Sequence, residues 1–470
     1  MTAPTRLIVG PFNRVEGDLE VTLDVSAGQV QAARVTAPMY RGFEHILAGR
    51  PPEDALVVAP RICGICSVSQ SVAAARALAA IAQVSPPDQG RRIADLVLAA
   101  ENAADHLTHF TLFFMPDFAR PLYADRPWFA LARDRFAAEG GRAGHELVPA
   151  RARFLHLMGL LAGKWPHSLA IQPGGVTKGV DSGERIRLLA ILADFRAALE
   201  TTLFADRLET IAALDNRAAL ESWADEAPMG RGDFRLFLHI ARDLGLDTLG
   251  RGPARFLSHG SFGLWPAGVV VDRATRAFDP ATVAEDLTCA WMDGPTRPAA
   301  DKAGAYSWCK APRLDGRSVE TGALARAMVA ADPLATSLAA DGGSVLARVV
   351  LRLVELARLV VAMEGWAGHL HPGAPICVEA PLPLRGHGIG LVEAARGALS
   401  HRVDLDGGRI RDYAIIAPTT WNFSPRDSAG NPGPLEQALE GAPVHADETT
   451  PVAVQHIVRS FDPCMVCTVH

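Results

Sequence analysis

Two pairs of cysteines at opposite ends of the chain constrain its fold more than any other feature. Cys63 and Cys66 form one CxxC motif, and Cys464 and Cys467 form the other, close to the end of the 470-residue sequence. The two residues between the cysteines of a pair let the chain turn, so that both sulfurs can reach one metal ion. This pattern indicates a four-thiolate metal site, and the spacing alone leaves the metal open.

Two alternatives to that interpretation remain. A structural zinc site also uses four cysteines, but its pairs usually lie near each other in a small fold that needs a metal for stability. A redox-active CxxC is the second alternative, and the presence of two pairs argues against it. The other three cysteines, Cys289, Cys309 and Cys377, are isolated and are expected in the core. An odd number of cysteines without a visible signal peptide argues against a disulfide framework.

Composition excludes several classes of protein. With 49% hydrophobic and 21% charged residues the chain is globular, and a net charge of −6 argues against a nucleic-acid binder. The most apolar stretch, residues 345–367, is interrupted by arginines and glutamates. A bilayer helix needs about 20 mainly apolar residues, so no membrane span is predicted. We expect a cytoplasmic protein.

The periodicity of apolar residues predicts a mainly helical chain. Alternation around short turns predicts two β-hairpins, at residues 18–36 and 401–416. Helical spacing predicts four long helices, at residues 68–82, 93–114, 185–214 and 345–363. Stretches rich in proline and glycine predict loops, at residues 115–127, 250–268, 371–390 and 424–443. We therefore expect a mainly α fold with small β elements (α+β), in a single domain over residues 1–470.

The first cysteine pair directly precedes a predicted helix. Ser67 is expected to cap the N-terminus of that helix with its hydroxyl group. Cys66 would then lie at the positive end of the helix dipole, which favours a thiolate.

Further motifs accompany the cysteine pairs along the chain. In order, they are Arg14-Val15-Glu16-Gly17, Arg41-Gly42-Phe43-Glu44, Asp105-His106-Leu107 with His109-Phe110, Glu393 to Leu399, and Pro418 to Asn422. Together with RICGIC and DPCMVC, these motifs resemble those of the large subunit of nickel–iron hydrogenases over essentially the whole chain. The resemblance implies the large helical domain of that family and the heterolytic activation of dihydrogen.

The resemblance also implies how the cysteines are used. In this family four thiolates hold nickel, and two of them bridge to an iron that carries carbon monoxide and cyanide. Matched motif by motif, Cys63 and Cys464 would be terminal ligands, whereas Cys66 and Cys467 would bridge. Thr419, which follows Pro418, would donate a hydrogen bond to a cyanide.

Proton transfer is the second implication. Heterolytic splitting of dihydrogen needs a base beside the metals, and the sulfur of Cys464 would be that base. Glu16 would take the proton onward, which requires burial to raise its pKa. Arg396 would lie over the metals with Asp105 and Asp462 holding it, because carboxylates can fix a guanidinium. Without the resemblance, an ordinary carboxylate at the edge of a hairpin would be the favoured explanation of Glu16. Surface ion pairs would be the alternative explanation of Arg396 and its two aspartates.

A second metal site is implied near the C-terminus. Glu44 and His470 look like ligands of a magnesium ion, to which Ile415 would offer its backbone carbonyl. A carboxylate suits magnesium well, whereas a histidine is less typical.

The chain departs from the usual family pattern at several positions. Gln70 stands where a histidine is common; it can donate a hydrogen bond to a thiolate but cannot titrate. Asp18 and Ala395 replace a histidine and a proline of the motifs. Ile65 and Phe113 are larger than the usual valine and leucine, which favours a narrowed gas channel and oxygen tolerance over simple repacking of the core.

These departures favour the regulatory, hydrogen-sensing branch of the family. Standard members are made with a C-terminal extension that a protease removes, whereas this sequence already ends at His470. The expected partners are a small iron–sulfur subunit, hydrogenase maturation proteins and a sensor histidine kinase, with dihydrogen as the substrate. The alternative is an energy-conserving uptake hydrogenase. A metal-free structural relative, as in respiratory complex I, is disfavoured because all four cysteines are present.

Overall fold

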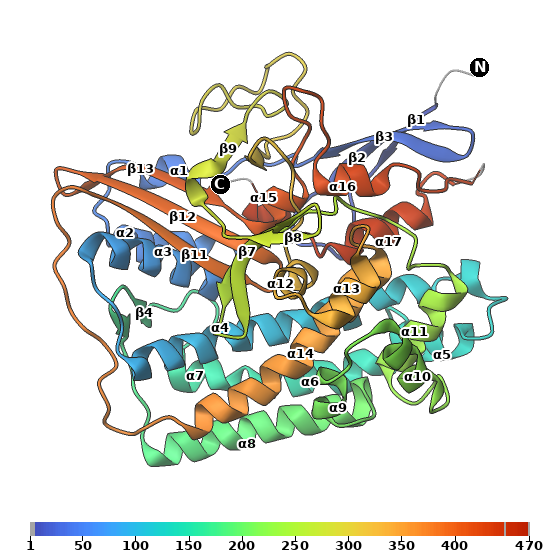
Figure 1. Ribbon diagram of the computed structural model, residues 1–470, viewed down its shortest axis with the longest axis horizontal. Helices are drawn as coiled ribbons and strands as arrows, with labels where there is room; N and C mark the ends of the chain where they lie inside the picture. The colour runs from blue at the N-terminus through green and yellow to red at the C-terminus, as the bar shows by residue number, and fades with distance from the viewer. Residues whose placement is uncertain (1–4, 446–447, 469–470) are drawn as a thin grey trace.

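Long helices form one layer of the molecule, and small antiparallel sheets lie against it (Figure 1). The computed structural model describes residues 5–445 and 448–468. Its α-helices are α1 Phe43–Leu47, α2 Asp54–Val58, α3 Ser67–Ala82, α4 Asp88–Thr108, α5 Phe129–Phe136, α6 Arg142–Phe154, α7 His156–Ala162, α8 Ser182–Ala198, α9 Leu208–Ala212, α10 Arg217–Asp225, α11 Asp233–Asp243, α12 Ala323–Val329, α13 Pro333–Ala339, α14 Val345–Gly368, α15 Pro418–Asn422, α16 Pro434–Leu439 and α17 Val452–Ser460.

The strands are short and pair in antiparallel fashion. They are β1 Thr5–Val9, β2 Glu20–Ser26, β3 Gln29–Thr36, β4 Ile171–Gln172, β5 Gly175–Val176, β6 Phe256–Ser261, β7 Trp265–Val271, β8 Ala274–Arg276, β9 Val283–Asp286, β10 Ala311–Leu314, β11 Gly386–Ala394, β12 Gly397–Asp406 and β13 Arg409–Ile416. Three of the sheets have three strands, in the orders β1-β2-β3, β6-β7-β8 and β11-β12-β13. The predicted fold class, mainly helical with small β elements, is confirmed.

Most of the predicted elements are present. The two hairpins are β2–β3 and β12–β13, and the second turns at Gly407 and Gly408, whose positive φ values of 60° and 75° favour glycine. The helices predicted at 68–82 and 345–363 are α3 and α14. The helix predicted at 93–114 is α4, which continues as a π-helical turn, His109–Phe114. The segment 185–214 is not one helix, because a π-helical turn at Leu199–Leu203 ends α8 and the chain then bends before α9.

Three predicted loops contain regular structure that their glycines and prolines concealed. Residues 250–268 include β6 and the start of β7, residues 424–443 include α16, and the end of 371–390 begins β11. In β11 the glycines have a packing role. Gly386, Gly388 and Gly390 alternate along one face of the strand, which is the face that meets α3.

This glycine face lets α3 approach the sheet closely. A Cβ atom added at Gly388 or Gly390 would overlap the carbonyl oxygen of Ala77 or Ala73, and one at Gly386 would lie 2.7 Å from a side-chain carbon of Ile81. Because α3 begins directly after the first cysteine pair, this contact fixes that pair against the sheet.

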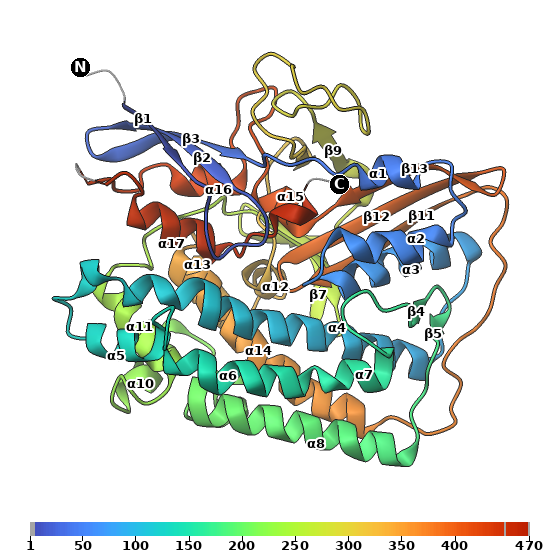
Figure 2. The same cartoon turned by 180° about the vertical axis from the view of Figure 1, so that it is seen from behind.

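The two ends of the chain also lie together. The sheet β1–β3 packs against α16, and the C-terminal helix α17 lies beside them in both views (Figure 2). The buried carboxylate of Glu436 on α16 accepts a hydrogen bond from the backbone N–H of Val35 on β3, at 3.0 Å. The C-terminal segment thus returns to the N-terminal one, as a shared site for both cysteine pairs requires.

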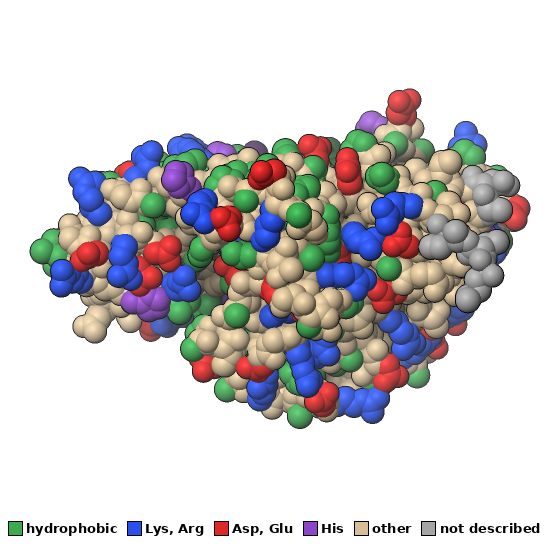
Figure 3. All heavy atoms as spheres, turned by 90° about the horizontal axis from the view of Figure 1, so that it is seen from above, with side chains coloured by type: hydrophobic (Ala, Val, Ile, Leu, Met, Phe, Trp, Pro, Cys, Tyr) green, Lys and Arg blue, Asp and Glu red, His purple; other side chains and the backbone are tan. Residues whose placement is uncertain are grey.

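Figure 3 shows basic and acidic side chains interspersed on the face that it presents. Among the described residues, no helix is both long and apolar enough to cross a membrane.

We predict that Gly390→Ala destabilises the protein, because its methyl group would collide with the backbone of α3. Overpacking of this kind costs about 1–3 kcal/mol, so the Tm measured by thermal denaturation should fall. Gly365→Ala is the matched control. A Cβ at Gly365, which lies on an exposed turn of α14, meets nothing within 4 Å, so that variant should be as stable as the parent or more stable. Equal Tm values for Gly390→Ala and the parent would contradict the proposed packing role.

Candidate metal centre

The four cysteines of the two CxxC motifs meet in one buried cluster. Cys63 follows a 3₁₀ turn, Cys66 immediately precedes α3, and Cys464 and Cys467 follow α17. The Sγ atoms lie 3.4 Å apart between Cys63 and Cys464, 3.2 Å between Cys66 and Cys467, and 2.9 Å between Cys464 and Cys467. All four ligand atoms are within 4.8 Å of one another. A disulfide requires about 2.05 Å, so these are free thiols.

The chemistry of this cluster fits a soft metal ion. Burial raises the pKa of the Cys464 thiol, whereas hydrogen bonds, above all from Cys464, lower the pKa of Cys63. One sulfur can therefore ionise with its neighbours as donors, but four adjacent thiolates would repel one another. A bound metal cation removes this penalty and deprotonates all four sulfurs. Soft thiolates of this kind suit nickel, iron or zinc rather than magnesium.

Arg41 joins the loops that carry the two cysteine pairs. Its Nη2 donates to the carbonyl oxygen of Ile62, directly before Cys63, and to that of Val466 at 2.6 Å, between Cys464 and Cys467. One guanidinium thus fixes the relative position of both loops. The sequence shows Arg41 only as part of a motif, and this contact was not predicted from it.

Glu16 is held beside Cys464 by backbone hydrogen bonds. The Glu16 N–H donates to the carbonyl of Pro463 at 3.3 Å, and the Met465 N–H donates to the carbonyl of Glu16 at 2.7 Å. Gly17 follows with φ of 84°, and a Cβ there would lie 2.9 Å from a methyl carbon of Val466. The side chain is half-buried; burial first, and then the nearby Cys63, raise the pKa of Glu16.

Arg396 is the fixed positive charge of the cluster. Its Nε donates to the carbonyl of Asp462 at 3.0 Å, and its Nη2 donates to Asp105 at 3.0 Å and to the carboxylate of Asp462 at 3.1 Å. Burial disfavours the charge, but Asp105 and Asp462 outweigh this effect and raise the pKa of Arg396. All three residues are buried, so they are not surface ion pairs.

Pro418 and Thr419 open α15 next to Cys464. The hydroxyl oxygen of Thr419 accepts a hydrogen bond from the Cys464 N–H at 3.1 Å. Both residues are buried. The short helix thus brings a hydroxyl group to the sulfur cluster.

The prediction that Ser67 caps α3 is wrong. Ser67 is the first residue of the helix, and its N-cap position is Cys66, whose side chain makes no capping bond. The buried carboxylate of Glu101, on α4, caps the helix instead. It accepts hydrogen bonds from the N–H groups of Val68 at 2.8 Å and Ser69 at 2.9 Å. Burial raises the pKa of Glu101 to about 7.

Gln70 is buried on the first turn of α3, and its amide oxygen lies 2.7 Å from Nε2 of His401 on β12. His401 follows the predicted Glu393 to Leu399 motif by two residues, but the motif did not single it out. Ile65 and Phe113 are each half-buried, in the first CxxC loop and in the π-helical turn after α4. The neighbouring Phe114, rather than Phe113, belongs to an aromatic cluster with Phe118 and Phe237.

The carboxylate predicted for a second metal is present in a charged cluster. Glu44 is buried, accepts a hydrogen bond from the Ile415 N–H at 2.8 Å, and binds Nζ of Lys310 through both oxygens at 3.0 Å. Lys310 also contacts Glu285 at 3.2 Å. Neither Lys310 nor Glu285 was predicted, because nothing in their local sequence marks them. His470 lies outside the described residues.

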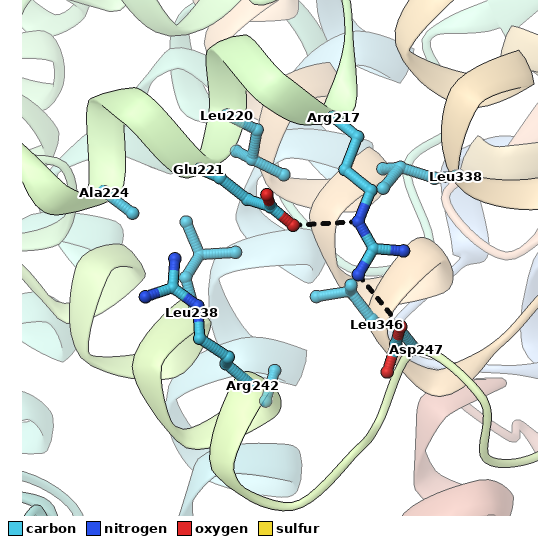
Figure 4. Close-up of a pocket in the computed structure, with 10 residues that line it drawn as sticks. Arg217, Leu220, Glu221, Ala224, Leu238, Arg242, Asp247, Leu338 and Leu346 are labelled. Atoms are coloured by element: carbon cyan, nitrogen blue, oxygen red, sulfur yellow. Dashed lines mark hydrogen bonds and ion pairs between the residues drawn. The ribbon is translucent and has the colours of Figure 1, made fainter.

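A pocket between α10, α11 and the start of α14 is separate from this centre (Figure 4). Leu220, Leu238 and Leu346 line it, and Arg217 is paired there with Glu221 at 2.8 Å and Asp247 at 2.9 Å. The second arginine of the pocket, Arg242, is paired with Asp225 at 3.0 Å, so both of its arginines are bound by carboxylates.

The mainly helical fold and the buried four-cysteine cluster define a metal-dependent protein whose ligands come from both ends of one chain. A sequence profile of the nickel-dependent hydrogenases matches residues 41–124 and 146–470. The chain belongs to this family, whose members are oxidoreductases that act on dihydrogen.

Individual relatives match over almost the whole length. The chain is 28% identical to the periplasmic NiFeSe hydrogenase large subunit of Desulfomicrobium baculatum, covering 99% of this chain and 95% of that one. It is 27% identical to the hydrogenase-2 large chain of Escherichia coli, covering 99% and 97%. The solved NiFeSe hydrogenase of Desulfovibrio vulgaris Hildenborough is 28% identical and superposes with a TM-score of 0.82, over 99% of this chain and 100% of that one.

Proposed function

We propose that this chain splits dihydrogen heterolytically at a nickel–iron centre held by Cys63, Cys66, Cys464 and Cys467. The observation that carries the proposal is the meeting of four buried sulfurs within 4.8 Å. When bound, such a centre supplies the two-electron chemistry that converts dihydrogen to protons and electrons. The first cysteine of each pair would be a terminal ligand, and the second would bridge to an iron carrying carbon monoxide and cyanide. The hydroxyl group of Thr419, after Pro418, would donate to a cyanide.

The chain's own residues would move the proton and set the charge. The sulfur of Cys464 would accept the proton, and the carboxylate of Glu16 would take it onward. The backbone bonds between Glu16 and the Cys464 loop support this order, as does the raised pKa of Glu16. Arg396, oriented by Asp105 and Asp462, would favour negative charge at the sulfurs.

A second metal would lie at Glu44. Two carboxylates, Glu44 and Glu285, meet at the ammonium group of Lys310, so oxygen ligands of the kind that magnesium prefers are gathered there. Magnesium would suit the oxygen of Glu44 and the backbone carbonyl of Ile415, with His470 as a further ligand.

We infer that residues 1–470 form a single domain, because one hydrophobic cluster includes residues from both cysteine loops and from the helical layer. Electrons would leave through a small subunit carrying iron–sulfur clusters, since Cys289, Cys309 and Cys377 form no iron–sulfur motif in the sequence. A cytoplasmic location and assembly by hydrogenase maturation proteins remain predictions.

Within the family we propose the hydrogen-sensing role, in which the protein turns over slowly and signals to a histidine kinase. The departures at Gln70, Asp18 and Ala395, and the larger Ile65 and Phe113, support this role. An uptake hydrogenase that feeds a respiratory chain is the alternative.

The metal centre predicts nickel and iron in about a 1:1 ratio in this subunit of the matured complex, apart from the iron of the small subunit's clusters. Infrared bands of carbon monoxide and cyanide should accompany it. Cys464→Ser should abolish hydrogen activation, because a neutral hydroxyl is a poor nickel ligand and a poor base. Cys377→Ser, at an exposed cysteine, should leave activity unchanged. Zinc as the only stoichiometric metal would refute the proposed centre.

Replacing Glu16 by glutamine keeps its shape and removes its proton. Loss of an essential proton relay typically costs 10²–10⁴-fold, so we expect hydrogen oxidation and hydrogen–deuterium exchange to fall in that range, about 10²–10⁴-fold. Conversion between ortho- and para-hydrogen needs no proton to leave the site and should persist. Glu20→Gln, on the exposed side of β2, is the control and should change none of these rates. Normal exchange in Glu16→Gln would place the proton path elsewhere.

The narrowed gas channel predicts the behaviour of a double variant. Ile65→Val with Phe113→Leu should make the enzyme lose activity in air over minutes to hours, while the parent keeps it, because dioxygen is larger than dihydrogen. Anaerobic turnover should change little. Phe129→Leu, at another half-buried phenylalanine, should remain as oxygen-resistant as the parent. Equal resistance in the double variant would leave Ile65 and Phe113 as packing residues.

The sensing role predicts that dihydrogen changes the autophosphorylation of a sensor histidine kinase bound to the complex. Turnover should lie below about 10 s⁻¹, the median for enzymes. The Cys464→Ser complex should bind the kinase and be insensitive to dihydrogen. Fast reduction of a quinone or cytochrome, with no response from the kinase, would establish the uptake alternative.

A further inference from the structure

A buried chain of hydrogen bonds runs from the sheet to the first turn of α3. Nδ1 of His401 lies 2.7 Å from the hydroxyl oxygen of Tyr413, and Nε2 of His401 lies 2.7 Å from the amide oxygen of Gln70. Each of the three residues is at most 1% exposed. A neutral imidazole is a donor at one nitrogen and an acceptor at the other, so the two bonds are not independent of each other.

The fold places the ends of this chain in defined positions. His401 is on β12 and Tyr413 is on β13, where Val403 pairs with Tyr413. His401 and Tyr413 are therefore diagonal neighbours on one face of the sheet. Gln70 lies one helical turn after Cys66, whose carbonyl accepts the Gln70 N–H at 3.2 Å, so the two side chains share a face of α3.

The hydroxyl of Tyr413 determines which atom donates and which accepts in each of these hydrogen bonds. Among the described residues, His401 is its only hydrogen-bond partner. If His401 donated from Nδ1, the buried proton of that hydroxyl would have no acceptor, which costs about 1–3 kcal/mol. Tyr413 therefore donates to Nδ1, the His401 proton resides on Nε2, and Nε2 donates to the amide oxygen of Gln70.

We propose that His401 and Tyr413 are positioning residues that orient the Gln70 amide so that its NH₂ group faces the sulfur of Cys66. The inference rests on the proposed function, because only a metal-bound thiolate needs this donor permanently. With the amide oxygen occupied by His401, both N–H donors of Gln70 lie at the other end of the planar amide group. A reversed amide would instead point its oxygen at negatively charged sulfur, which is electrostatically unfavourable.

This arrangement explains how a residue that cannot titrate can replace a histidine beside the sulfurs. An isolated glutamine amide can flip by 180° at little cost in free energy, because its oxygen and NH₂ ends have nearly the same shape. Here the orientation is set through His401 by the hydroxyl of Tyr413, whose proton has Nδ1 of His401 as its acceptor. A donor held in this way would stay available to the Cys66 sulfur without any change in its own protonation.

The test uses Tyr413→Phe in the complete complex with the small subunit. Loss of the hydroxyl removes the donor that fixes the His401 tautomer, so the Gln70 amide is no longer held in one orientation. We expect the carbon monoxide and cyanide stretching bands to shift in the same direction as in Gln70→Leu, which removes the amide. In the Gln70→Leu background, Tyr413→Phe should produce no further shift.

Tyr306→Phe is the matched control. It removes the hydroxyl of a half-buried tyrosine, which donates to Glu436 at 2.8 Å and not to any group of the metal centre. It should lower the Tm without moving the bands. Unshifted bands in Tyr413→Phe, or the same shift in the presence and absence of Gln70, would overturn the positioning role. A parent protein without these bands would instead refute the proposed nickel–iron centre, so the two failures are distinguishable.

Discussion

The structure depends on one electrostatic constraint: four sulfurs that can all be ionised only with a metal bound are buried within 4.8 Å of one another. Neither burial nor mutual repulsion favours four thiolates, so their charge has to be balanced by a metal and by fixed cations. In this fold the N-terminal and C-terminal segments of the chain contact each other at the cysteines. Arg41 bonds to both cysteine loops, and the backbone of Glu16 pairs with the loop of Cys464. The four cysteines thus lie where the two terminal segments of the chain pack together.

Buried ion pairs extend this arrangement into the surrounding elements. Arg326 on α12 donates to the carboxylate of Glu393 at 2.5 Å and to the carbonyl oxygens of Ala394 at 3.0 Å and Ala395 at 3.2 Å. It thereby holds the turn that precedes Arg396. Buried ion pairs often contribute little net stability, because desolvation offsets their attraction. Their value here is positional, since the guanidinium of Arg396 has to remain between Asp105 and Asp462.

The sequence was sufficient for the features that are encoded locally or by motif. The alternation in β2–β3 and the helical period of α14 are local, and the cysteine spacing by itself indicates a shared metal. Glycine-rich β11 was missed because its glycines serve contact with α3, and a single sequence does not distinguish a packing glycine from a loop glycine. Lys310 was missed for a different reason, since its carboxylate partners, Glu44 and Glu285, become neighbours only through the tertiary fold.

The error at Ser67 changes the explanation of how the thiolates are stabilised. A helix N-terminus contributes roughly half a positive charge, which would help Cys66 if it were free. Here the N–H groups of Val68 and Ser69 donate to the carboxylate of Glu101, so these two groups are not available to stabilise a thiolate at Cys66. An ionised Glu101 also repels a thiolate at Cys66. Stabilisation of the sulfurs must therefore come from the metal and from Arg396, which makes the centre dependent on metal for its charge balance as well as for its chemistry.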